Sequence, residues 1–227
     1  MELLLDTIHL ADIQRYQKTI QLAGVTSNPT IIKKEGRVPF FDHLRKIRQI
    51  IGPKASLHVQ VVGGQTAEMV EDAHEILQNI DSEVFIKVPT NEAGLAAMKI
   101  LKAEGVHITA TAIYTEMQGY LAMSVGADYL APYYNRMLNM GIDASQIIAA
   151  WSKKIAHEHL STKTLAASFH NVDQINQALR SGAQAITTGP DILDTALATP
   201  AIGAAIQDFT HDWESVYGAG CQIKDLK

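Results

Sequence analysis

The chain has 227 residues, of which 47% are hydrophobic, and 19 lysines and arginines against 24 aspartates and glutamates leave a net charge of −5. This composition is typical of a compact globular protein, and its mildly acidic balance disfavours a surface for nucleic acid or anionic lipid. No apolar run reaches the ~18 residues of a membrane span. The single cysteine, Cys221, forms neither an internal disulfide nor a metal framework by itself.

The first residues and the cysteine content indicate a compartment. Residues 1–6 have neither the basic start nor the apolar stretch of about 7–15 residues that a signal peptide needs. A chain without disulfides suits a reducing environment. We therefore expect a cytoplasmic protein whose partner is a small molecule, with no nucleic acid and no membrane involved.

Short segments rich in β-branched residues alternate along the chain with longer segments of helical period. The expected strands are Leu3–Asp6, Leu22–Asn28, Leu57–Val62, Val84–Pro89, Ile108–Tyr114, Tyr129–Tyr134, Thr164–Phe169 and Ala185–Gly189. The clearest helices between them are Thr66–Asn79 and Ala93–Glu104. After the last strand, Pro200–Tyr217 is expected to form a closing helix, followed by a tail over residues 218–227.

This alternation predicts the fold class. No linker or low-complexity tract interrupts it, so residues 1–227 are expected to form one domain. Eight strands alternating with helices in a chain of this length predict an α/β protein, a (β/α)₈ TIM barrel with an extra C-terminal helix. The alternative is an open doubly wound sheet, but its usual dinucleotide-binding fingerprint is missing from the sequence.

Polar residues occur at the ends of nearly all the predicted strands. In such a barrel the active site lies at the carboxyl ends of the strands. These positions hold groups that can bond a sugar or a carbonyl, namely Asp6, Asn28, Gln60, Lys87, Thr111, Tyr133 and Ser168.

Lys87 is the most informative of these residues, because it lies in the apolar strand segment Val84–Pro89. Neither face of a barrel strand is solvated, so an ammonium group here is desolvated and its pKa falls. A neutral amine can attack a ketone and form a Schiff base. The alternative is a lysine that extends from the strand end into solvent.

Other candidates also have simpler interpretations. Asp6 can merely cap the following helix, and Asn28-Pro29 can be a plain turn. Tyr133 and Arg136 follow one strand closely, and the guanidinium together with the Ser168 hydroxyl suits a phosphate.

Metal and nucleotide chemistry have little support in the sequence. His157 and His159 diverge on a helix and have no third ligand nearby. The sequence contains no Walker loop, G-x-S-x-G elbow or H-E-x-x-H motif. A modest basic area around residues 33–48 lacks the interleaved aromatic residues of a nucleic-acid site.

Taken together, the motifs resemble those of the transaldolase family, and most closely its fructose-6-phosphate aldolase branch. The resemblance covers nearly the whole chain. Its motifs are Leu5-Asp6-Thr7, Gly24-Val25-Thr26-Ser27-Asn28-Pro29, Val59-Gln60-Val61, Ile86-Lys87-Val88-Pro89, Ala131-Pro132-Tyr133-Tyr134-Asn135-Arg136 and Ala166-Ala167-Ser168-Phe169.

The resemblance implies a class I aldolase in which Lys87 attacks the keto carbon of a ketose and forms a Schiff base, without a cofactor or metal. By the same resemblance, Asp6 manages hydroxyl protons near the bond that is cleaved. Gln60, Thr111 and Tyr133 hold the catalytic water and move protons. Thr26 and Asn28 match substrate contacts, and Arg136 and Ser168 match the anchor of the sugar phosphate.

Two positions separate the branches of this family. The resemblance places Glu and Phe in true transaldolases where this chain has Gln60 and Tyr133. We therefore expect reversible aldol cleavage of fructose 6-phosphate or a related ketose, with transfer of a dihydroxyacetone unit between sugar phosphates as the alternative. A catalytically silent sugar-phosphate-binding barrel is the third hypothesis, against which the retention of Lys87, Asp6 and Tyr133 argues.

The chain departs from the family pattern at His170, where relatives commonly have Lys or Arg near the phosphate. An imidazole of ordinary pKa, near ~6.5, is mostly neutral at physiological pH, which weakens phosphate binding. The preferred acceptor is therefore expected to be an unphosphorylated aldehyde. The resemblance also implies a homo-oligomer, a decamer of two pentamers, with the C-terminal helix packed on a neighbour.

Overall fold

The computed structural model describes residues 1–226 and contains a closed barrel of parallel strands in the order β1 to β8. The predicted α/β barrel is therefore confirmed, and the open sheet is excluded. The strands are β1 (Glu2–Asp6), β2 (Gly24–Thr26), β3 (Ser56–Gln60), β4 (Phe85–Pro89), β5 (Ile108–Ile113), β6 (Tyr129–Pro132), β7 (Lys163–Ala166) and β8 (Ala185–Thr188).

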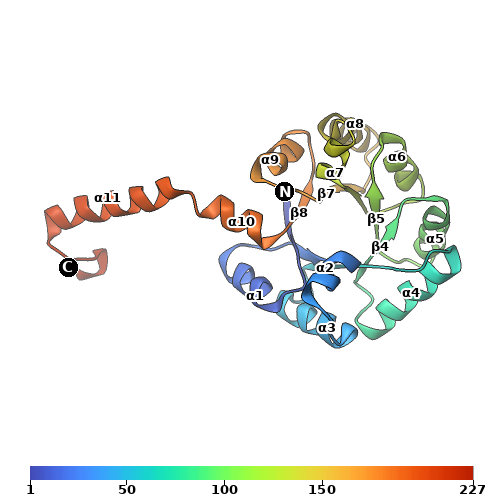
Figure 1. Ribbon diagram of the computed structural model, residues 1–227, viewed down its shortest axis with the longest axis horizontal. Coiled ribbons are helices and arrows are strands. Elements are labelled where there is room, and N and C mark those ends of the chain that lie inside the picture. The colour runs from blue at the N-terminus through green and yellow to red at the C-terminus, as the bar shows by residue number, and fades with distance from the viewer. Residues whose placement is uncertain (227) are drawn as a thin grey trace. The chain divides into compact units, whose positions relative to one another are not determined.

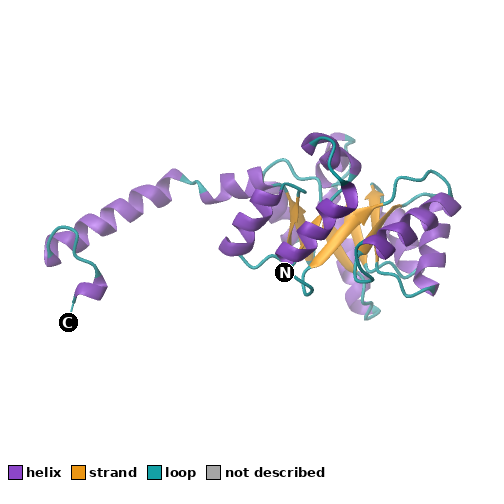
Figure 2. Ribbon diagram, turned by 90° about the horizontal axis from the view of Figure 1, so that it is seen from below, coloured by secondary structure: helices purple, strands orange, loops and turns teal. Residues whose placement is uncertain are grey.

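Helices follow the strands and surround the barrel, as Figure 1 shows from one end and Figure 2 from the side. They are α1 (Leu10–Thr19), α2 (Pro29–Glu35), α3 (Phe40–Ile51), α4 (Thr66–Asn79), α5 (Glu92–Ala103), α6 (Glu116–Ser124), α7 (Tyr134–Asn139), α8 (Ala144–His157) and α9 (Val172–Arg180). A further helix, α10 (Pro190–Leu197), follows β8 in the chain. Because every strand has helices on its outer side, side chains on the inner side fill a lumen that is largely closed to water.

The start of α5 packs closely against the end of β4, the strand that carries Lys87. The Asn91 side chain accepts a hydrogen bond from the Gly94 backbone N–H at 2.8 Å and so caps α5. A Cβ at Gly94 would lie 1.8 Å from the Pro89 carbonyl oxygen, so only glycine lets the helix approach the strand this closely.

The interior of the barrel is apolar toward the strand starts and polar toward the strand ends. Leu4, Tyr129, Leu165 and Ala185 form a buried apolar cluster, with Phe85 packed against it. Two residues further along β1 and β4, the same face carries Asp6 and Lys87. The period of two along each strand therefore places the ionisable groups at the carboxyl-end mouth.

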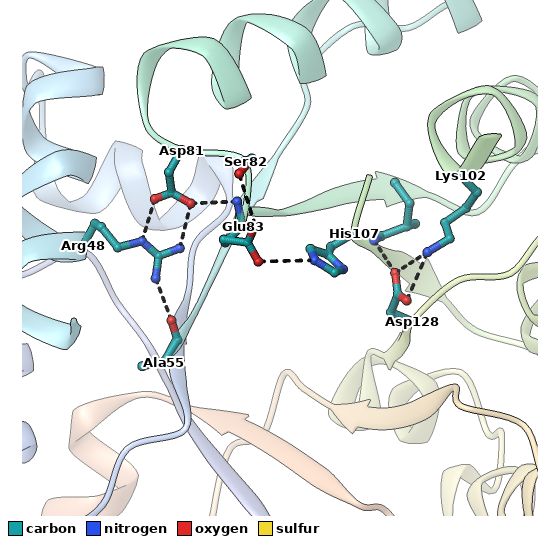
Figure 3. Close-up of polar contacts among 9 residues, drawn as sticks. Arg48, Ala55, Asp81, Ser82, Glu83, Lys102, His107 and Asp128 are labelled. Carbon is teal, nitrogen blue, oxygen red and sulfur yellow. Dashed lines mark hydrogen bonds and ion pairs between the residues drawn. The ribbon is translucent and has the colours of Figure 1, made fainter. Parts of the chain in front are cut away.

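Polar contacts join the amino-terminal ends of several strands, as Figure 3 shows. Arg48 of α3 pairs with Asp81 at 2.7 Å and also donates to the Ala55 carbonyl at 2.6 Å. Lys102 of α5 pairs with Asp128 at 2.9 Å, and the same carboxylate accepts from the Ile108 N–H. These contacts tie together the segments that precede β3 to β6, at the end of the barrel opposite Asp6 and Lys87.

The residues from Asp191 onward form a separate compact unit. Its long helix α11 spans Pro200–Tyr217, as predicted, and none of its side chains is buried. A short 3₁₀ turn, η1 (Ile223–Asp225), follows within the predicted tail. That α11 closes a barrel stays a prediction. In residues 1–226 no helix is both long and apolar enough to cross a membrane.

Candidate active site

Lys87 lies inside the barrel and is only 4% exposed. Its Nζ donates a hydrogen bond to the Ser27 carbonyl at 2.9 Å. Burial lowers the pKa of the Lys87 ammonium from its usual value, and the charge of Asp6 opposes part of that effect. A lowered pKa makes the neutral amine more accessible, and a neutral amine at the mouth of the barrel can attack a ketone to form an imine.

The segment that holds Lys87 is itself held by β3. The N–H and hydroxyl groups of Ser27 both donate to the His58 carbonyl, at 3.0 and 3.1 Å. The Ser27 carbonyl, on the other side of the residue, accepts from Lys87. Ser27, which is fully buried, therefore links β3 to Lys87 and positions the lysine nitrogen.

Asp6 lies at the end of β1 and belongs to a short chain of hydroxyl groups. The Thr26 hydroxyl donates to Asp6 Oδ1 at 2.5 Å and contacts the Thr187 hydroxyl at 2.6 Å. Because the Thr26 proton goes to the carboxylate, Thr187 donates to Thr26. The structure thus shows Thr26, which is fully buried, as the residue that orients Asp6.

Thr111 in β5 meets Tyr133, which follows β6 directly. The Thr111 hydroxyl donates a hydrogen bond to the Tyr133 hydroxyl at 3.2 Å. The β5–β6 register shifts between Ala110 and Ile113, and Ala112 adopts a left-handed φ of 55°. A bulge of this kind re-aims side chains beside an active site. Since Tyr133 accepts from Thr111, its own proton remains available for another partner.

The surroundings of Tyr133 keep its phenol protonated. Burial raises the pKa of Tyr133, while the Thr111 hydrogen bond and the Arg136 charge oppose the rise. The Arg136 guanidinium lies over the ring, 4.6 Å from its centroid, and Tyr114 packs edge-on at 5.6 Å. A neutral phenol can donate a proton and then take it back.

Gln60 and Lys87 are register partners at the ends of β3 and β4, so both side chains share the inner face. The Gln60 Oε1 atom is buried and has no hydrogen-bond partner within residues 1–226. A buried acceptor of this kind is satisfied by a water molecule or a ligand. This position therefore suits the role in holding water that the resemblance implies.

Asn28 lies just after β2 and is the N-cap residue of α2. Its side-chain oxygen accepts from the Ile31 N–H at 3.0 Å and caps α2. This bond fixes the amide at the end of β2, next to the residue whose carbonyl holds Lys87. The cap uses the oxygen, so the amide N–H groups are what Asn28 can offer to a substrate hydroxyl.

The residues of the predicted phosphate anchor come from two consecutive strand-to-helix connections. Arg136 lies in the first turn of α7 with an exposed side chain, and Ser168 follows β7 with a left-handed φ of 62°. His170 is exposed, and its backbone N–H donates to the Gln174 side chain at 2.7 Å. The two connections are joined where the Asn135 N–H donates to the Ser168 carbonyl at 3.0 Å.

His58 is a residue that the sequence reasoning missed. It is fully buried, stacks on Phe85 at 4.7 Å and meets Tyr129 edge-on at 5.3 Å. Its Nδ1 lies 2.8 Å from the Thr109 hydroxyl and its Nε2 lies 2.9 Å from the Ser56 hydroxyl. The signal was present, because His58 stands two residues before Gln60 and so shares its face.

The hydrogen bonds around His58 fit a neutral ring. The Ser56 hydroxyl donates to the Ala23 carbonyl at 3.3 Å, so it accepts from Nε2–H, and Nδ1 then accepts from Thr109. Burial lowers the pKa of His58 well below its usual value of 6.5, and the charges of Lys87 and Arg48 lower it further.

This neutrality predicts a pH-dependent stability difference for a His58→Phe variant, which keeps the aromatic stacking. Below pH 6.5 the unfolded wild-type chain binds a proton that the folded chain does not, so acid favours unfolding of the wild type. The wild type should lose up to about 1.4 kcal/mol of unfolding free energy per pH unit relative to the variant. Urea denaturation of both proteins between about pH 5 and pH 8 measures this, and a pH-independent difference would contradict a neutral His58.

A cleft of about 990 Å³ lies at the other mouth of the barrel. Its lining includes residues at the strand starts, such as Glu2, Ser56, Phe85 and Tyr129, and none of the predicted site residues. Within residues 1–226, no three His, Cys, Asp or Glu side chains are grouped so that they could hold a metal ion.

Comparisons with known proteins identify the family of the chain. The family model described as transaldolase/fructose-6-phosphate aldolase matches residues 3–225. A protein of Streptococcus pneumoniae (strain ATCC 700669 / Spain 23F-1) named "Probable fructose-6-phosphate aldolase" is 49% identical over 213 residues, which cover 94% of this chain and 96% of that protein. The chain therefore belongs to the transaldolase/fructose-6-phosphate aldolase family, as its motifs indicated.

Proposed function

We propose that this chain is a class I aldolase that cleaves and forms fructose 6-phosphate or a related ketose through a Schiff base on Lys87. The observation that carries the proposal is the state of this lysine, which is 4% exposed in the barrel lumen with a lowered pKa. Membership of the family and the name of the Streptococcus relative support the same reaction.

In the proposed reaction the Lys87 nitrogen attacks the keto carbon of the sugar. The keto oxygen leaves as water and an iminium remains on Lys87. When the C3–C4 bond breaks, its electron pair moves into the iminium to give an enamine, and the C4 hydroxyl proton passes to Asp6. Protonation at C3 and hydrolysis then release dihydroxyacetone and restore the amine.

The other residues have positioning and proton-transfer roles in this reaction. Tyr133, in contact with Thr111, has a proton to deliver, and Gln60 has a buried acceptor that can orient the water needed for imine formation and hydrolysis. Arg136 and Ser168 would bind the phosphate of the substrate. The proposal requires no metal or cofactor.

Transaldolase activity is the second candidate, since the family description includes both reactions. The neutral amide of Gln60 and the phenol of Tyr133 favour free cleavage, because hydrolysis of the enzyme-bound three-carbon unit needs a water molecule and a proton donor. We also propose a homo-oligomer, with the decamer implied by resemblance as its form. The exposed apolar side chains of α11, including Phe209 at 71% and Ile206 at 59%, support contact with a neighbouring copy.

Product analysis tests the proposed reaction. With fructose 6-phosphate alone, the protein should release free glyceraldehyde 3-phosphate and dihydroxyacetone, and a Lys87→Arg variant should not. If products form only when sedoheptulose 7-phosphate and glyceraldehyde 3-phosphate are supplied together, the chain is a transaldolase. If neither mixture reacts, the proposal of a catalytic barrel is wrong.

A further inference from the structure

The two residues proposed to bind phosphate belong to different segments, so their spacing depends on how those segments are joined. Arg136 lies on α7 after β6, and Ser168 lies in the connection from β7 to α9. A guanidinium and a hydroxyl bind one phosphate well only when both reach it without rearrangement.

Backbone contacts provide part of this link. The Tyr134 N–H donates to the Ala167 carbonyl at 2.9 Å, and the Asn135 N–H donates to the Ser168 carbonyl at 3.0 Å. Ser168 nevertheless has a left-handed φ of 62°, which a residue with a side chain keeps only when its surroundings impose it. A further restraint on this connection is therefore to be expected.

The Gln174 side chain provides that restraint. It comes from the first turn of α9, where the Gln174 N–H donates to the Asn171 side chain at 2.9 Å. Its Nε2 donates to Asn135 Oδ1 at 2.8 Å, and its Oε1 accepts from the His170 N–H at 2.7 Å. Gln174 and Asn135 are 9% and 8% exposed, so water competes little for these bonds.

We propose that Gln174 is a positioning residue that sets the geometry of the phosphate anchor, and hence the preference between phosphorylated and unphosphorylated substrates. One planar amide, with a donor and an acceptor, bonds to the start of α7 and to the loop after Ser168 at the same time. The inference rests on the proposed function, because it concerns the same site.

A Gln174→Leu variant, similar in size but unable to make either bond, tests this role. Its KM for fructose 6-phosphate should rise about tenfold or more, since misplacement by a fraction of an ångström weakens phosphate binding. Its kcat/KM for joining dihydroxyacetone to unphosphorylated glyceraldehyde should change less than about twofold, since that reaction does not use the anchor. Inorganic phosphate, used as an inhibitor of the unphosphorylated reaction, should bind correspondingly more weakly.

Two further variants make the result decisive. Asn135→Ala removes the hydrogen bond between Gln174 and Asn135 from the other side. It should likewise raise the KM for fructose 6-phosphate and leave the reaction with glyceraldehyde nearly unchanged. The Gln174→Leu/Asn135→Ala double variant should be no worse than the single variants. Gln177→Leu, one turn further along α9, removes hydrogen bonds to Asp173 and Tyr134. This control should keep the wild-type preference between fructose 6-phosphate and the unphosphorylated substrates.

The outcomes distinguish the two proposals. Equal loss with both substrates in the Gln174→Leu and Asn135→Ala variants, or no loss with either, would overturn the positioning role while the wild type remains an aldolase. A wild type that reacts with neither substrate would instead overturn the proposed function.

Discussion

A Lys87→Met variant is expected to lose at least about 10⁴-fold of the aldolase activity, because it removes the nucleophile on which every later step depends. Methionine is unbranched and of similar length, so it should fill the same space in the lumen. A Lys87→Arg control keeps a positive charge yet cannot form an imine, and should be equally inactive. Steady-state cleavage of fructose 6-phosphate measures the loss. Substantial activity in either variant would contradict the nucleophilic role.

The Lys87→Met variant should also have a larger free energy of unfolding than the wild type at neutral pH. The pKa of Lys87 is lower in the folded chain than in the unfolded chain, so at pH values between the two the unfolded chain binds more protons. Wild-type stability therefore rises with pH in that interval. The advantage of Lys87→Met is largest below the folded-state pKa and shrinks as the pH approaches 10.5, which denaturation at several pH values would detect.

Tyr133→Phe should reduce the rate of cleavage to free aldehyde by about 10²-fold or more, the usual size of a general acid–base contribution. Phenylalanine keeps the ring under the Arg136 guanidinium and against Tyr114, so the fold should change little. What disappears is the hydroxyl that accepts from Thr111 and offers its own proton. Imine formation and release should slow, and transfer to an aldehyde acceptor should persist better than hydrolysis.

Tyr114→Phe is the matched control for this prediction, because it removes the hydroxyl of a neighbouring phenol whose ring is in edge contact with the Tyr133 ring. Its cleavage rate should stay within about twofold of the wild type. Equal effects of the two substitutions would show that proton transfer by Tyr133 in particular does not account for the loss.

The barrel was predictable because strands buried on both faces are rich in β-branched residues and alternate with helices of clear period. Strand ends were less predictable. Tyr133 and Ser168 lie just beyond β6 and β7 rather than within them, since a bulge and a left-handed residue occur at this mouth. Such local conformations depend on tertiary contacts that no short sequence window contains.

The site was predictable where a residue type was unusual for its position, as with a lysine in an apolar strand. It was not predictable where an ordinary residue gains its role from a distant partner. Gln174 is one polar residue among several on α9, and only the fold brings it to Asn135. His58 could have been found from its spacing to Gln60, but its contact with Thr109 on β5 could not.

The most direct test of the account is to trap the proposed intermediate. Wild-type protein incubated with dihydroxyacetone or fructose 6-phosphate and reduced with borohydride should gain the mass of one reduced ketose or three-carbon adduct per chain. Peptide mapping by mass spectrometry should place it on Lys87. Tyr133→Phe should still be labelled, and Lys87→Arg should not. Labelling at any other lysine, or no labelling with either ketose, would contradict the assignment of Lys87 as the Schiff-base residue.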